Sequence, residues 1–222
     1  MIFRKKVLTL TFNKDQLLLY AVTDRAWVGR QTLLEQIEDA LKGGVTMVQL
    51  REKELEPQAF VAEAVQVREL CHRYGVPLII NDNVEVALES GADGVHVGIE
   101  DAPVAGIRKQ AGPDFIIGAT AKTVEQARFA EISGADYLGV GAVFPSPTKK
   151  NAIRITKDQL KEICSSVSIP AVAIGGISLS NAREIQGGGM AGIAVVSAIF
   201  AADDIRSAAQ QLKTEALRVT TP

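Results

Sequence analysis

Two polar groups in this chain combine residue types and spacings that could bind anions. Gln49, Arg51 and Lys53 alternate at the end of a mostly apolar run. Alternate residues of a strand face the same side, so two cations would form a clamp for negatively charged oxygens. A run of charges that only faces solvent is the alternative interpretation. The other group is Ser146, Pro147, Thr148 and Lys149. It offers hydroxyls and a cation on a backbone restrained by proline, which suits anion binding. A plain surface turn is the alternative interpretation.

A further group could hold a hard cation. Asn81 and Asp82 emerge abruptly from a wholly apolar run, and Asp101 follows a later one. Asp82 and Asp101 together could bind one such cation, with phosphate oxygens and water completing an octahedral shell. Helix capping is the alternative, since Asn-Asp-Asn precedes a helical pattern and Pro103 suits a first helical turn.

Other metal and thiol chemistry is limited by the scarcity of histidine and cysteine. The two histidines, His72 and His96, cannot form a multi-histidine metal centre. Cys71 and Cys164 have no zinc-type spacing and make a disulfide framework improbable, which fits a reducing, cytoplasmic location. His96 could hydrogen-bond a substrate, although a lone histidine on an apolar strand is more often a satisfied core residue.

Composition places the chain among ordinary folded proteins. Of its 222 residues, 47% are hydrophobic and 23% charged, and 24 basic against 26 acidic residues leave a net charge of −2. A general nucleic-acid binder would carry a basic excess, so nucleic acid is excluded as a partner. No apolar run is long enough to span a bilayer, so we expect no membrane partner either.

The elements that must position these groups are eight short apolar runs separated by helical patterns. Their nearly continuous apolar character is typical of parallel strands buried on both faces. No linker interrupts them, which favours a single (β/α)8 TIM barrel over residues 17–222, preceded by an extension over residues 1–16. The eight runs cover residues 17–24, 46–52, 77–83, 94–98, 115–120, 137–144, 171–176 and 192–199.

In such a barrel the polar groups belong at the carboxyl ends of the strands. Gly175 and Gly176 end the seventh run, and Val196 and Ser197 lie on the eighth strand, where these barrels habitually bind phosphate. The assembled groups include fixed cations, two acids for a hard cation and no nucleophile–base pair. That set favours stabilisation of a departing diphosphate over covalent catalysis.

The chain resembles the thiamine-phosphate synthase family from about Leu19 to Ala198. Seven ordered sequence blocks carry the resemblance, and together they are much more specific than any one. They are VTDR (22–25), QLREK (49–53), IND (80–82), GVHVG (94–98), GADY (134–137), TK (148–149) and IGGI (174–177).

The resemblance implies a transferase of thiamine biosynthesis. The family joins a hydroxymethylpyrimidine diphosphate to a thiazole phosphate, and the carbon–oxygen bond to diphosphate breaks before the thiazole nitrogen captures the cation. It also implies Mg²⁺ as cofactor and a homodimer.

Carried over by position, the family's site falls on three sets of residues. Asp82 and Asp101 would hold Mg²⁺, while Arg51, Lys53 and Lys149 would be catalytic cations beside Gln49 and Asn81 at the pyrimidine diphosphate. Thr120 would contact substrate through its hydroxyl. The thiazole phosphate would be held by Ser146, Pro147, Thr148, Gly176, Val196 and Ser197.

Three departures from the family pattern affect affinity more than reaction class. Ile99 replaces a common glutamine, Thr120 stands for serine, and Ser146 for threonine. Two alternatives stay open: a TenI-type thiazole tautomerase, and a non-catalytic protein that binds thiazole phosphate or thiamine phosphate and regulates another process. The cations and Asp101 argue against the tautomerase.

Overall fold

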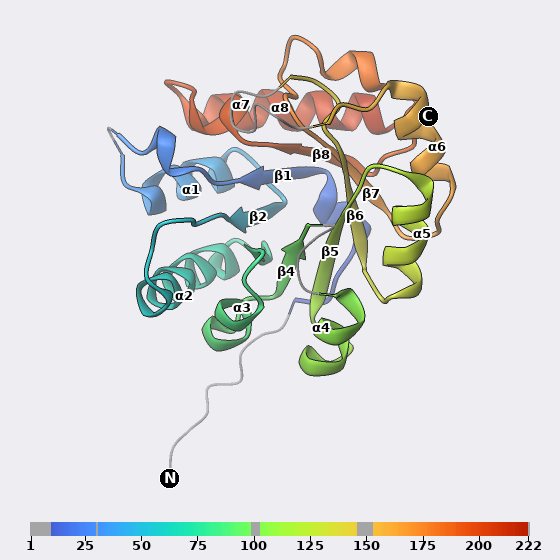
Figure 1. Ribbon diagram of the computed structural model, residues 1–222. Coiled ribbons are helices and arrows are strands. Elements are labelled where there is room, and N and C mark those ends of the chain that lie inside the picture. Colours follow the sequence, from blue (N-terminus) through green and yellow to red (C-terminus); the bar gives the residue numbers. More distant parts are fainter. Residues whose placement is uncertain (1–9, 30, 99–102, 146–152, 222) are drawn as a thin grey trace.

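The computed structural model describes residues 10–29, 31–98, 103–145 and 153–221. Eight parallel strands form a closed barrel in chain order, with β1 paired to both β2 and β8, and helices surround it (Figure 1). This confirms the (β/α)8 fold. Seven of the predicted runs contain one strand each, and the run over residues 115–120 covers all of β5 except its last residue, Ala121. The strands are β1 (Leu19–Val22), β2 (Met47–Leu50), β3 (Leu78–Asn81), β4 (Gly94–Val97), β5 (Ile116–Ala121), β6 (Tyr137–Gly141), β7 (Ala171–Ile174) and β8 (Gly192–Val195).

The helices follow the strands, and a 3₁₀ turn stands between β7 and β8. The α-helices are α1 (Leu33–Lys42), α2 (Pro57–Arg73), α3 (Val84–Ser90), α4 (Val104–Ala111), α5 (Val124–Ile132), α6 (Lys157–Ser165), α7 (Ser197–Phe200) and α8 (Ile205–Thr220). The 3₁₀ turns are η1 (Lys14–Leu17), η2 (Arg25–Trp27) and η3 (Ala182–Ile185). Within the described part of the chain, no helix has the length and apolar character needed to cross a membrane.

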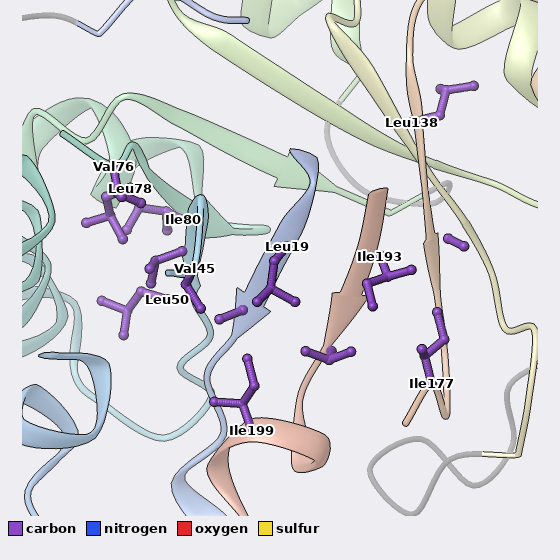
Figure 2. Close-up of a cluster of buried hydrophobic side chains, with 14 of the residues drawn as sticks. Leu19, Val45, Leu50, Val76, Leu78, Ile80, Leu138, Ile177, Ile193 and Ile199 are labelled. Carbon is purple, nitrogen blue, oxygen red and sulfur yellow. The ribbon is translucent and has the colours of Figure 1, made fainter. Parts of the chain in front are cut away.

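Each strand divides its side chains between two apolar layers, which explains the continuous apolar runs. Outward residues such as Leu19, Leu50 and Ile193 pack against the helices (Figure 2). Inward residues such as Met47 and Ile79 fill the barrel itself. Fully burying a side chain of this size contributes about 1.5–3 kcal/mol, so both faces of every strand need apolar residues except where the barrel opens.

The beginning of the described chain closes the amino-terminal end of the barrel. Phe12 stacks on Tyr137 at the start of β6, with ring centroids 5.9 Å apart. The Thr46 hydroxyl donates to the Gln16 carbonyl over 2.8 Å. Residues 10–16 therefore pack at the end of the barrel opposite to the carboxyl ends of the strands.

Two local predictions need correction. Val196 and Ser197 do not lie on the eighth strand, because β8 ends at Val195 and Ser197 begins α7. Pro103 is the N-cap of α4 rather than a residue of its first turn, since α4 begins at Val104. The first helix, α1, ends at Lys42 with Gly43 as its C-cap.

Candidate active site

A cavity of about 300 Å³ opens at the carboxyl ends of the strands. Its lining comes from strand ends and the loops that follow them, as expected for a barrel of this kind. The structure brings together there nine of the predicted site residues: Gln49, Arg51, Lys53, Asn81, Asp82, Thr120, Gly176, Val196 and Ser197. The other five, Asp101, Ser146, Pro147, Thr148 and Lys149, lie outside the described residues.

Successive side chains at the end of β2 point to opposite sides, so the cations that face the cavity are separated from the ion pair that Glu52 makes on the other side. Arg51 and Lys53 line the cavity, whereas Glu52 points away and accepts from Arg25 Nε over 2.6 Å. Glu52 is almost wholly buried, with 2% of its side chain exposed. The segment is therefore no uniformly solvated charge run, and its cations face the site.

Asp24 and Thr23, at the end of β1, hold Arg51 in place. Arg51 Nη1 lies 3.0 Å from Asp24 Oδ2, and the Arg51 backbone N–H donates to the Thr23 hydroxyl, also over 3.0 Å. Thr23 is buried. A guanidinium held on one edge keeps its remaining N–H groups available for a multidentate anion.

The end of β3 supplies a carboxylate from an unusual backbone conformation. Asp82 has φ +60°, in the left-handed region that aspartate and asparagine tolerate better than most residues. Its backbone N–H donates to the His96 carbonyl over 2.8 Å, and the Asn81 amide donates to its carboxylate. The capping alternative applies to Asn83, whose Oδ1 accepts from the Val86 N–H at the start of α3. Asn81 and Asp82 both line the cavity.

The opposite rim is built from backbone at the end of β7. Gly176 has φ +65°, and a Cβ atom there would come within 2.2 Å of the Pro145 carbonyl oxygen. The Asn181 amide donates to the Gly176 carbonyl over 2.9 Å and steadies this turn. Only glycine fits such a position, and its exposed backbone can approach a phosphate oxygen closely.

A chain of hydrogen bonds crosses the barrel beneath the cavity. Gln49 Nε2 lies 2.7 Å from Tyr20 Oη, which is 2.8 Å from Tyr137 Oη. Tyr137 Oη lies 3.1 Å from His96 Nδ1, and His96 Nε2 lies 3.1 Å from Thr120 Oγ1. His96 is thus both a satisfied residue of the barrel wall and part of the cavity lining.

Sequence reasoning missed four contributors to the site. Lys122 lines the cavity two residues beyond Thr120, and the same alternation that identified Arg51 could have found it. Asp24 belongs to the VTDR block (22–25), but the family resemblance gave no reason to expect that it holds Arg51. Tyr20 and Tyr137 gave no local signal, because their hydroxyls meet across the barrel from positions 117 residues apart.

Metal and thiol groups are sparse in the described part of the chain. No cluster of three histidine, cysteine, aspartate or glutamate side chains there could hold a metal ion. Asp82 supplies a hard oxygen ligand at the cavity, and its predicted partner Asp101 lies outside the described residues. Cys71 and Cys164 are free thiols. Burial raises the pKa of Cys71, and it raises that of Cys164 to about 12, so neither is a reactive thiolate.

Comparison with known proteins identifies this arrangement. A family model described as thiamine monophosphate synthase matches residues 19–199. A thiamine-phosphate synthase from Ruminiclostridium cellulolyticum is 47% identical over 200 residues, covering 90% of this chain and 95% of the relative. Another, from Desulfitobacterium hafniense, is 49% identical over 87% of this chain and 94% of its own.

A solved structure agrees with the sequence relatives. A thiamine phosphate pyrophosphorylase from Pyrococcus furiosus superimposes with a TM-score of 0.86 at 39% identity, covering 94% of this chain and 99% of its own. A 3-hexulose-6-phosphate synthase shares only the fold, with a TM-score of 0.64 and 16% identity.

Proposed function

The chain belongs to the thiamine monophosphate synthase family, and from that membership we propose that it joins a hydroxymethylpyrimidine diphosphate to a thiazole phosphate by a dissociative, Mg²⁺-assisted substitution. Its enzymatic activity is thiamine-phosphate synthesis, a transferase reaction. One observation carries the mechanism. Fixed cations and a glycine-built rim face each other across a single cavity, so two phosphorylated substrates can meet there.

The cationic wall of the cavity suits the leaving diphosphate. Negative charge grows on diphosphate as the carbon–oxygen bond breaks, and cations already in place stabilise it without reorganisation. Arg51 is pre-positioned by Asp24, and Lys53 lies beside it along the chain. In this proposal Lys149 completes the set, while Gln49 and Asn81 orient the pyrimidine. Water exclusion then protects the cation until the thiazole nitrogen attacks.

Mg²⁺ fits the chemistry of the acidic residues. Asp82 lines the cavity with a carboxylate, and hard oxygen ligands of this kind are those that Mg²⁺ prefers. Asp82 and Asp101 would hold the ion. Bound there, Mg²⁺ supplies positive charge that neutralises diphosphate oxygens.

The glycine rim suits the thiazole phosphate. Gly176 exposes backbone next to Val196 and Ser197, which line the same side of the cavity. Residues 146–148 would complete this phosphate site. The phosphate would anchor the thiazole with its nitrogen toward the pyrimidine, a positioning role that accounts for much of the rate.

The decisive experiment measures diphosphate release from hydroxymethylpyrimidine diphosphate, with and without thiazole phosphate and with Mg²⁺ or EDTA. We expect release only when thiazole phosphate and Mg²⁺ are both present. No release from protein that still binds thiazole phosphate would instead support the TenI-type tautomerase or the non-catalytic binding protein.

Replacing Gly176 with alanine should damage the thiazole phosphate site selectively. The added Cβ would meet the Pro145 carbonyl oxygen and would strain a backbone at φ +65°, so the rim must move. We expect KM for thiazole phosphate to rise at least tenfold, with a smaller change for the pyrimidine substrate. Steady-state kinetics with each substrate varied in turn checks this, and Gly106→Ala is the matched control, because nothing lies within 4 Å of its added Cβ. Equal KM changes for both substrates would contradict the assignment.

The homodimer and the cytoplasmic location remain proposals that follow from family resemblance. The described surface offers an apolar stripe on α5 for self-association, where Phe129 is 73% and Ile132 85% exposed. Large exposed apolar side chains three residues apart on one helix are typical of interaction surfaces.

A further inference from the structure

The hydrogen-bond chain from Gln49 to Thr120, here called the relay, can use every proton in only one direction. Gln49 Nε2 donates to Tyr20 Oη. Either tyrosine can donate across the 2.8 Å between the two hydroxyls, but only donation from Tyr20 to Tyr137 gives the buried proton of Tyr20 a partner. In that direction the proton of Tyr137 goes to His96 Nδ1. A neutral His96 that accepts at Nδ1 carries its proton on Nε2, and this nitrogen donates to Thr120 Oγ1.

Burial keeps the two tyrosines in the form that the relay needs. Tyr20 and Tyr137 are 1% and 0% exposed, and burial raises the pKa of both hydroxyls. Each therefore stays protonated and brings one donor. Gly118 and Gly139 make room for the relay, since a Cβ atom on Gly118 would lie 2.4 Å from Tyr137 Oη and one on Gly139 2.9 Å from His96 Cε1.

The direction of the relay determines what its two ends present to the cavity. With Nε2 bonded to Tyr20, Gln49 keeps Oε1 as an acceptor, and among the described residues no hydrogen bond takes up that oxygen. At the other end Thr120 Oγ1 accepts from His96, so its own hydroxyl proton can point to a ligand. Both residues line the cavity.

We propose that Tyr20 and Tyr137 are positioning residues that hold the Gln49 amide oxygen toward the cavity and hold His96 as its Nε2–H tautomer, so that the site accepts a 4-aminopyrimidine and rejects the 4-oxo counterpart. An amino group donates to Gln49 Oε1, whereas an oxo group would place two acceptors against each other. The inference rests on the proposed function for the identity of the ligand. The relay itself does not depend on it.

The same direction favours the reaction as well as binding. When the carbon–oxygen bond breaks, its electron pair leaves with diphosphate and the exocyclic methylene carbon attached to the pyrimidine ring becomes cationic. The lone pair of the amino nitrogen delocalises toward that carbon, so positive charge grows on the amino group. An acceptor at Gln49 Oε1 then binds the transition state more strongly than the substrate. In a relay of opposite direction, the Gln49 Nε2–H group would face the N–H of the substrate amino group, and the two donors would repel each other.

The tautomer of His96 can be measured without any activity. The chain has two histidines, so ¹⁵N imidazole spectra contain one signal pair for His96 and one for His72. We expect a protonated Nε2 and an unprotonated Nδ1 in His96 at neutral pH. Tyr137→Phe should remove this preference and leave the His72 signals unchanged, because His72 pairs with Asp93 instead. A protonated Nδ1 in the wild-type protein would overturn the proposal.

Ligand preference gives the second readout. Calorimetry with the 4-amino and 4-oxo forms of hydroxymethylpyrimidine monophosphate measures binding without bond cleavage. We expect Tyr20→Phe to lower the preference for the amino form about tenfold, because the Gln49 amide is then free to turn over. The KM for thiazole phosphate should stay unchanged.

The third tyrosine supplies the control. Tyr74 is 38% exposed and donates to Glu38 on the surface, so Tyr74→Phe removes a hydroxyl far from the relay and should leave the preference intact. An unaltered preference in Tyr20→Phe would overturn the positioning role. Failure of both pyrimidines to bind the wild-type protein would overturn the ligand assignment and the proposed function, while the His96 tautomer would still report on the relay.

Discussion

Arg51→Gln is expected to lower kcat by about 100- to 1,000-fold, the usual cost of removing one pre-positioned donor from a developing anion. The guanidinium faces the cavity while Asp24 holds one of its edges at 3.0 Å. Glutamine has similar polarity but no charge, so it cannot neutralise diphosphate. Single-turnover rates with saturating substrates, compared with steady-state kcat, locate the loss in the chemical step.

The matched control is another ion-paired arginine outside the site. Arg183 pairs with Glu215 at 2.6 Å, and its side chain is 70% exposed, so Arg183→Gln should leave kcat unchanged. If Arg51→Gln raised KM and left kcat intact, Arg51 would only bind substrate uniformly and its proposed role in leaving-group stabilisation would be wrong.

Asp82→Asn is expected to raise the Mg²⁺ concentration needed for half-maximal turnover at least tenfold and to lower kcat at limiting Mg²⁺ by about 100-fold, because a neutral amide is a much weaker ligand for a hard cation. Asparagine tolerates φ +60° as aspartate does, so this change isolates the charge from the backbone. Turnover measured across a Mg²⁺ titration tests the expectation.

Two variants sharpen this result. Asp114 is an exposed carboxylate between α4 and β5, at the other end of the barrel, so Asp114→Asn should keep the wild-type Mg²⁺ dependence. Asp101→Ala should act as Asp82→Asn does and change thiazole phosphate affinity little. Unchanged Mg²⁺ dependence in Asp82→Asn would remove this carboxylate from the metal site.

The barrel could be predicted because its signals are local and repeat. Each strand is buried on both faces and therefore reads as an apolar run, and the break in that run marks where the barrel opens. The same alternation placed Gln49 and Arg51 on the inward face, and the structure confirms that both line the cavity. By contrast, the prediction that Ser197 lies on the eighth strand was wrong. An apolar run does not show where β8 ends and the short helix α7 begins.

The residues of the sequence by themselves determined the eight strands and their barrel, the shared face of Gln49, Arg51 and Lys53, and the family of the site. Only the tertiary structure decided how these residues are held: Asp24 on Arg51, Asn181 on the turn at Gly176, and Tyr20 on Tyr137. The physical reason is range. Burial and alternation act within a few residues and leave a mark in the local pattern. A hydrogen bond between β1 and β6 exists only because the sheet curves until the two side chains meet inside a closed barrel.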